Sequence, residues 1–250
     1  MPFTLAHPAV VLPLRRTGLP MTALVAGSTV PDLRSFVPWL GHGLAERAHS
    51  LLGVVTVDPA LALVLVAAWV WVLRDVLVDV APDAVRERLE PRVRLSARQW
   101  ALTVPAAVVG SATHVGWDVF THQGRWGTRH VAWLRAEHWF WPGYTWAQAA
   151  SGVVGLAVVG CAAVAWVRAR PRVPRADPPL LPRATLPAIG AVLVAVAVAT
   201  GAERLHRGVQ PAAHHAVVTT LQVAVVAVVL GCAAWWVLRG VRRTRPSLRR

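Results

Sequence analysis

The sequence predicts an all-α fold, a polytopic helical membrane bundle with about five or six membrane segments. Hydrophobic residues make up 55% of the 250 residues, charged residues make up only 15%, and the mean hydropathy is +0.48. Soluble domains carry roughly 25% charged residues, so this chain lacks the polar side chains that would cover a globular surface. Several apolar runs also approach or exceed the roughly 20 residues that a helix needs to cross a bilayer.

The apolar runs alternate with polar or proline-containing stretches, which sets the order of the predicted membrane segments. The first and fifth runs are shorter than a full span, and we expect them to stop part-way in the bilayer or to extend into flanking turns. We expect residues 1–155 to form a helical membrane core that carries the His/Asp motifs, and residues 156–250 to add further spans and a basic C-terminal tail. The six predicted segments are residues 19–30, 51–73, 100–118, 146–167, 186–200 and 216–238.

Arginine supplies all of the basic charge, because none of the 26 Lys and Arg residues is a lysine. The arginines gather in short stretches between the apolar runs, at 15–16, 86–98, 168–183 and 239–250. Cytoplasmic loops of membrane proteins carry such an excess of positive charge, so the net charge of +14 indicates topology and argues against nucleic-acid binding. Six spans then place both termini in the cytoplasm. The arginine-only, Ala- and Val-rich usage indicates a GC-rich bacterial genome, hence a bacterial plasma membrane with membrane lipids as partners.

Ionisable side chains at membrane depth are rare, costly and usually functional, and here they gather on the extracytoplasmic side of the predicted topology. Asp32 ends the first segment, His49 precedes the second, and His114, Asp118 and His122 lie at the outer end of the third. His114 and Asp118 are four residues apart and therefore project from one helix face. Imidazole nitrogens and carboxylate oxygens are ligands that zinc accepts, so these residues form a candidate site for one or two divalent metal ions.

A structural explanation competes with the metal site. A single His-x-x-x-Asp pair also arises when the two side chains only hydrogen-bond to each other and hold helices together. Two further candidate ligands at the same depth favour the metal site. Judged by residue type alone, His7 lies at the membrane interface. It could reach the cluster only if residues 2–14 enter the membrane as a re-entrant segment.

Four motifs occur in order along the first half of the chain: Met1-Pro-Phe-Thr-Leu-Ala-His7-Pro8, Gly27-Ser-Thr-Val-Pro-Asp32, His49-Ser-Leu-Leu-Gly53 and Thr113-His114-Val-Gly-Trp-Asp118-Val-Phe-Thr-His122. Together they resemble a bacterial integral-membrane family of unknown function. That family is itself distantly similar to membrane-bound metal-dependent hydrolases and to zinc-dependent phospholipase C-like proteins. The resemblance covers roughly the first 155 residues, and the rest of the chain shares only the general character of membrane spans.

The resemblance implies a shared set of metal ligands and adds the first histidine of the chain to it. One departure counts against full activity, because similar proteins tend to have Gln-His before the fourth span and this chain has Gln148-Ala149-Ala150-Ser151. If that histidine is a ligand in relatives, this chain lacks it. The implied metal ligands here are His7, Asp32, His49, His114, Asp118 and His122.

The sequence therefore predicts a membrane-embedded metal-dependent hydrolase that acts near the extracytoplasmic interface. Its predicted cofactor is a divalent metal ion, and Zn²⁺ is the preferred candidate. Asp32 and Asp118 are the candidate catalytic carboxylates, which would bridge a second metal or orient a ligand or the water. A site at interfacial depth favours a lipid-like substrate, such as a lipid or a lipid-linked phosphoester. The alternative is a non-catalytic membrane protein, a transporter or an ion or proton relay, that uses the same cluster.

Overall fold

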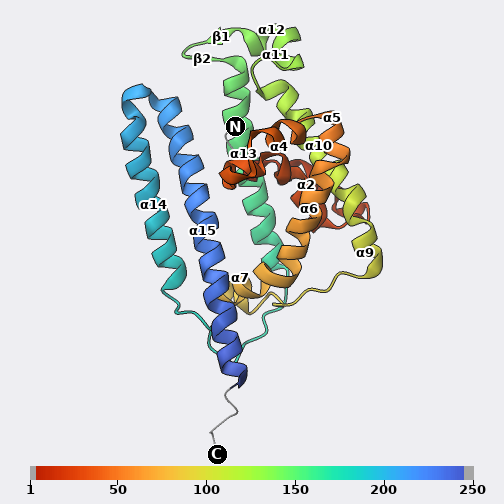
Figure 1. Cartoon of the computed structure of the whole chain (residues 1–250), viewed down its shortest axis with the longest axis vertical. Helices are drawn as coiled ribbons and strands as arrows, with labels where there is room; N and C mark the ends of the chain where they lie inside the picture. Colours follow the sequence, from red (N-terminus) through yellow and green to blue (C-terminus); the bar gives the residue numbers. More distant parts are fainter. Residues whose placement is uncertain (1–3, 245–250) are drawn as a thin grey trace, which may run out of the picture. The chain divides into compact units, whose positions relative to one another are not determined.

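A computed structural model describes residues 4–244 and is helical almost throughout, which confirms the predicted all-α fold class (Figure 1). The chain divides into two compact units, each built from two stretches of sequence. Unit 1 comprises Met1–Ala67 and Leu95–Ala165, and unit 2 comprises Ala68–Arg94 and Trp166–Arg250.

Unit 1 contains many short helices in its first stretch and two long helices in its second. The first stretch holds η1 (Thr4–Ala6), α1 (Pro8–Val11), η2 (Leu12–Arg16), α2 (Met21–Thr29), η3 (Val30–Asp32), α3 (Leu33–Phe36), η4 (Pro38–Leu40), α4 (His42–Ala48), α5 (Leu51–Val55) and most of α6 (Val57–Ala68). The second stretch holds α9 (Ala97–Ala101), α10 (Thr103–Thr121), α11 (Trp126–His130), α12 (Ala132–Arg135), strands β1 (Glu137–His138) and β2 (Trp141–Pro142), and most of α13 (Gly143–Arg168). The two short strands pair antiparallel, with His138 opposite Trp141.

The centre of unit 1 is the close crossing of α2 and α10, which lie side by side (Figure 1). Small side chains make this approach possible. A Cβ at Gly27 would lie 2.7 Å from the Cα of Ala107, and a Cβ at Gly110 would lie 2.8 Å from the backbone nitrogen of Ser28. Real Cβ contacts are never this short, so glycine is required on both helices at the crossing.

The ends of these two helices fall close to the polar residues that the sequence singles out. Pro31 has no backbone N–H with which to continue the hydrogen bonding of α2, so the chain leaves α2 through the short turn η3, which ends at Asp32. At the other helix, α10 ends at Thr121 because His122 is extended, with φ −115° and ψ 137°. The polar residues therefore lie at helix ends, where the backbone changes direction.

Within the part of the chain that the structure describes, four helices are long and apolar enough to cross a membrane, namely Val57–Val80, Gly143–Arg168, Thr185–Arg207 and Val209–Thr244. The predicted segments 146–167, 186–200 and 216–238 fall within the last three. The predicted segment 51–73 starts later in the structure, at residue 57, because Thr56 departs from helical geometry with φ −124° and ψ −71°.

The first and third predicted segments form shorter or more polar helices than those four. In the first, α2 has only nine residues. In the third, α10 has 19 residues, but its buried side chains include Ser111, His114 and Asp118. These two helices pack on each other, so their polar groups face protein.

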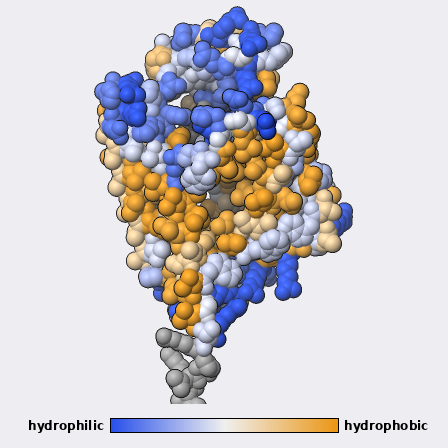
Figure 2. Space-filling view, viewed as in Figure 1, coloured by the Kyte–Doolittle hydropathy of each residue, from blue (hydrophilic) through white to orange (hydrophobic). Residues whose placement is uncertain are grey.

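Unit 2 consists of a hairpin of two long helices and several short helices that carry charged residues. Its elements are the π-helical turn η5 (Trp69–Leu73), α7 (Arg74–Val80), α8 (Asp83–Arg86), α14 (Thr185–Arg204), η6 (Leu205–Arg207) and α15 (Val209–Thr244). The turn between α14 and α15 includes Gly208 at φ 104°, a left-handed conformation that favours glycine. Figure 2 shows apolar side chains along the shafts of this hairpin and hydrophilic side chains at its turn. Near the other end of α15, Val76, Cys232 and Trp235 form a small buried core.

Gly110→Ala and Gly116→Ala add the same methyl group to α10 with opposite expected results. At Gly116 nothing lies within 4 Å of the new Cβ, whereas at Gly110 the α2 backbone already occupies that space. We expect Gly110→Ala to lower the free energy of unfolding by about 1–3 kcal/mol through overpacking. We expect Gly116→Ala to raise it by up to about 1 kcal/mol, because alanine favours helix over glycine. Thermal unfolding in detergent micelles measures both, and equal melting temperatures would contradict the close crossing.

Candidate metal centre

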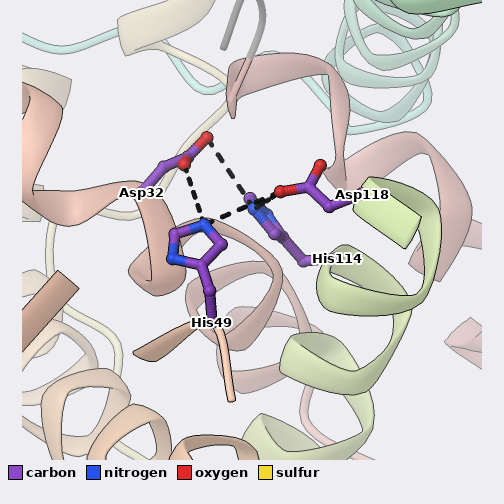
Figure 3. A group of neighbouring side chains, drawn as sticks. All are labelled: Asp32, His49, His114 and Asp118. Atoms are coloured by element: carbon purple, nitrogen blue, oxygen red, sulfur yellow. Dashed lines mark ion pairs between the residues drawn. The ribbon is translucent and has the colours of Figure 1, made fainter. Parts of the chain in front are cut away.

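Four side chains of unit 1 point toward one another and offer two nitrogen and two oxygen ligands (Figure 3). They are Asp32 from the end of η3, His49 from the turn between α4 and α5, and His114 and Asp118 from α10. Their ligand atoms all lie within 4.8 Å of one another. Residues far apart in sequence therefore converge as the sequence predicted, at a place where side chains are largely buried.

The distances between these atoms suit ligands around a common ion better than direct ion pairs. His49 Nε2 lies 3.3 Å from Asp32 Oδ1 and 3.6 Å from Asp118 Oδ2. His114 Nε2 lies 3.4 Å from Asp118 Oδ2 and 3.8 Å from Asp32 Oδ2. Charge-assisted N–H···O bonds are shorter, at roughly 2.7–2.9 Å. Ligands about 2.1 Å from a tetrahedral zinc ion are separated by about 3.4 Å, which is close to the observed spacing.

His114 is the most firmly oriented member of the cluster. Its side chain is fully buried, and its Nδ1 donates to the backbone carbonyl of Ser28 at 2.8 Å. Ser28 lies in the last turn of α2, where helix carbonyls lose their intrahelical partners. This bond assigns the proton to Nδ1 and leaves the Nε2 lone pair for a ligand. Within residues 4–244, Nε2 is buried without a hydrogen-bond partner, which fits a metal-ligating nitrogen.

Asp32 is oriented by a residue from the N-terminal segment. Thr4 Oγ1 donates to Asp32 Oδ2 at 2.6 Å, and both residues are buried. Burial alone would raise the pKa of Asp32, but the His49 and His114 imidazoles and the Thr4 hydroxyl outweigh it and hold that pKa well below its usual range. The carboxylate is therefore ionised at neutral pH, as a metal ligand must be.

The turn that carries His49 depends on the Ser and Gly of its motif. Ser50 caps α5, because its Oγ accepts from the backbone nitrogen of Gly53 at 3.0 Å. A Cβ at Gly53 would lie 3.0 Å from the Cα of Ala48 and closer still to the backbone of Arg47. The His-Ser-Leu-Leu-Gly sequence thus folds as a tight helix-to-helix turn that presents the imidazole.

His7 and His122 lie on the other side of the Asp118 carboxylate. Oδ2 of Asp118 faces the two histidines described above, while Oδ1 lies 3.3 Å from His122 Nδ1 and 4.0 Å from His7 Nε2. The His7 ring stacks on the ring of His114 at a centroid distance of 3.8 Å. Burial and the nearby His114 lower the pKa of His7 to about 4, and burial also lowers the pKa of His122. His7 is therefore neutral at physiological pH and able to act as a ligand.

His7 reaches the cluster because the N-terminal segment folds back on the rest of unit 1. The chain reverses after η2 at Gly18, which has φ 81°, and α1 contacts both α2 and α10. On its other side, Ala6 packs so closely against α13 that a Cβ at Gly155 would lie 2.7 Å from the Ala6 Cβ. Residue type alone predicted that His7 lies at the membrane interface, whereas the motif resemblance grouped it with the other ligands. The structure places His7 beside those ligands.

Sequence reasoning missed the residues that orient the ligands. Thr4 lies within the Met1–Pro8 motif, but nothing in that motif indicates a hydrogen bond to Asp32. The carbonyl of Ser28 carries no sequence signal at all. A second buried pair lies close by, because Asp58 is fully buried and accepts a hydrogen bond from Ser111 on α10.

Two cavities open onto the cluster within unit 1. The first, which we call the apolar cavity, has a volume of about 310 Å³ and runs from His7, Asp118 and His122 to the valines at positions 10, 154 and 158. The second, which we call the polar cavity, has a volume of about 280 Å³ and is lined by Asp32, Asp118, Arg34 and Arg125, among others. Asp32, Asp118 and His122 line both cavities, so the cluster is reachable from two sides.

These features define a helical membrane protein with a candidate metal centre built from His and Asp side chains. The chain belongs to the family of a domain of unknown function, DUF4184, whose sequence profile matches residues 1–238. The match extends well beyond the roughly 155 residues over which the motifs resemble a family of unknown function. No curated protein and no solved structure matches the chain significantly.

The alanine at the place of the expected Gln-His pair does not face the cluster. Ala149 is not among the residues of α13 that line the apolar cavity, which are Gln148, Ser151, Gly152, Val154, Gly155 and Val158. Gln148 does approach the cluster, because its Nε2 lies 3.5 Å from Nε2 of His122. The departure at position 149 thus leaves the donor set described above complete.

Thr4→Val should weaken metal binding without removing a ligand. The substitution keeps the side-chain shape but removes the hydroxyl that holds Asp32, and loss of such an orienting bond typically costs 10–100-fold in metal affinity. Competitive zinc titration of the purified protein measures the dissociation constant. Thr29→Val is the matched control, because the Thr29 hydroxyl only donates to the Val25 carbonyl within α2. Equal affinities for both variants would show that the Thr4 bond does not support a metal site.

Proposed function

We propose that the chain is a membrane-embedded metal-dependent hydrolase whose metal is held by Asp32, His49, His114 and Asp118. The observation that carries the proposal is the buried, converging set of two imidazole nitrogens and two carboxylates. Two carboxylates this close together repel each other when ionised, and a divalent cation is the simplest group that offsets this repulsion in a buried place. The mixed N/O donor set suits zinc, and also manganese or iron.

A second ion is compatible with the arrangement around Asp118. Its two oxygens face different histidines, with His49 and His114 on one side and His7 and His122 on the other. A carboxylate in this position is a natural bridge between two ions. We therefore extend the proposal to one or two zinc ions, with His7 and His122 as ligands of the second.

Residues of the protein would hold the metal ligands and the attacking water in position. A divalent ion in the cluster would supply Lewis-acid activation of water and of an ester oxygen. Ser28 and Thr4 hold the ligands in place, and Asp118 lies at the meeting point of both cavities, with a side chain 8% exposed. With a single ion held through Oδ2, the Oδ1 of this carboxylate would be placed to accept a proton from an attacking water. Asp32, more deeply buried, would orient its neighbours.

The two cavities support a lipid or lipid-linked phosphoester as substrate. The apolar cavity suits an acyl or prenyl chain, and two of its valines, Val10 and Val154, are 51% and 61% exposed at its rim. The polar cavity brings Arg34 and Arg125 to the same carboxylates, and arginine is well suited to a phosphate group. The junction of head group and chain would then lie at the metal ligands.

The distribution of arginine supports the location of this activity. Under the positive-inside rule, the arginine-rich segments and the C-terminus face the cytoplasm of a bacterial cell, whereas the N-terminal segment reaches the cluster through Thr4 and His7. The cluster then lies near the extracytoplasmic interface of the plasma membrane. A proton or ion relay through the same histidines is the competing function, and it requires neither a bound metal nor a scissile substrate.

A hydrolysis assay with metal-stripped and zinc-restored protein tests the proposal. We expect the zinc-restored protein to release product from long-chain phosphoester lipids in mixed micelles, at least tenfold faster than from water-soluble phosphoesters. Asp118→Asn keeps the shape of the side chain but removes its charge, and we expect activity to fall at least 100-fold. His130→Ala is the matched control, because His130 bonds the Trp126 carbonyl outside the cluster. Size-exclusion profiles and melting temperatures confirm that the variants fold.

Two results of this assay would contradict the proposal. The first is activity that does not depend on added metal or on Asp118. The second is the absence of hydrolysis in every folded preparation, together with proton or ion flux in liposomes that Asp118→Asn abolishes. The second result would identify the relay as the function.

A further inference from the structure

Unit 2 contains a separate charged cavity, which the candidate metal centre does not use. We call it the arginine cavity. It has a volume of about 880 Å³ and is lined by α7, the segment that follows α8, the linker before α14 and the last turns of α15. Five arginines line it, namely Arg86, Arg92, Arg175, Arg239 and Arg242.

Four acidic residues also line the cavity, namely Asp75, Asp79, Glu90 and Asp177. The first two already accept hydrogen bonds from the cavity walls. Asp79 accepts hydrogen bonds from Arg86 Nη2 at 3.0 Å, from Trp235 Nε1 at 2.8 Å and from the Leu180 nitrogen at 2.8 Å. Such a carboxylate is fully occupied with holding the walls together. Its negative charge is therefore offset by the positive charge of Arg86.

The other of these two carboxylates is Asp75, on the same helix. It accepts from Arg239 Nη1 at 2.8 Å and from Arg92 Nε at 3.3 Å. Arg242 lies at the exposed end of α15 and also lines the cavity. The surrounding segments 74–94, 168–183 and 239–243 together contain 13 arginines and six acidic residues. The local field thus favours an anion.

One buried donor in the cavity wall is only partly used. Arg86 is 4% exposed, and although its Nη2 bonds Asp79, its Nε has no hydrogen-bond partner within residues 4–244. A buried guanidinium N–H without an acceptor is costly. This Nε is closed off from the cavity, so Arg86 serves mainly to hold Asp79 in the cavity wall.

The aromatic residues around the cavity indicate its depth in the membrane. Trp235 lines the cavity, and the guanidinium of Arg239 lies over Trp235 and Trp236 at 4.8 and 5.2 Å from their ring centroids. Tryptophan and arginine gather at the level of lipid headgroups. The 36 residues of α15 give a length of about 54 Å, well beyond the roughly 30 Å hydrocarbon core, so its final turns extend to that level.

We propose that the arginine cavity binds the phosphate group of an anionic phospholipid. The cavity combines five arginines, a surrounding excess of positive charge and an adjoining pair of interfacial tryptophans. Basic pockets beside transmembrane helices bind lipid headgroups of this kind. A bound lipid would tie α7, the linker and the end of α15 together through one shared anion.

Native mass spectrometry of the full-length protein in detergent tests this proposal. The probes are phosphatidylglycerol, phosphatidylcholine and inorganic phosphate. The test variant is the double substitution Arg92→Gln and Arg242→Gln, which removes two exposed cavity arginines. The control is Arg94→Gln with Arg243→Gln, which removes two exposed arginines of the same segments that do not line the cavity.

We expect the wild type and the control to bind phosphatidylglycerol with similar dissociation constants, at least tenfold tighter than phosphatidylcholine. The cavity variant should bind phosphatidylglycerol at least tenfold more weakly. Equal binding by the cavity variant and the control would overturn the proposal. So would a site that takes millimolar inorganic phosphate and shows no preference for phosphatidylglycerol, because its ligand would then be a soluble anion.

Discussion

The close crossing of α2 and α10 is the constraint on which the rest of unit 1 depends. Gly27 and Gly110 let the two backbones approach until no side chain fits between them. That approach brings the Ser28 carbonyl to His114, so a packing contact also sets the direction of an imidazole. It also places the turn after α2, with Asp32, opposite the last turns of α10. The candidate metal centre is thus a consequence of helix packing rather than of a flexible loop.

The same packing explains why the cluster holds so many polar atoms in a buried place. Ionised carboxylates away from water are costly unless charge and hydrogen bonds offset the loss of hydration. Here Thr4 and Ser28 satisfy the outer atoms, and the inner atoms face one another at 3.3–3.8 Å. A divalent cation would complete this balance, so metal binding and the stability of unit 1 should be coupled.

Much of the fold and of the site could be predicted from the sequence, for identifiable physical reasons. Apolar runs of spanning length report helices directly, and a His and an Asp four residues apart must share a helix face. Convergence of His49 with His114 could be inferred from their common depth alone. The boundary at residue 57 could not, because it depends on local backbone geometry at Thr56. The fold-back of the N-terminal segment that delivers His7 likewise depends on tertiary packing.

Elemental analysis of the detergent-purified protein, after dialysis against trace zinc, manganese and iron, tests the central claim most directly. We expect one or two ions per chain in the wild type. His114→Ala should retain at least tenfold less, because it removes the best-oriented ligand, while His138→Ala, whose Nε2 bonds the Trp133 carbonyl, should retain the wild-type amount. Metal-free wild-type protein, or equal metal content in wild type and a folded His114→Ala variant, would contradict the account.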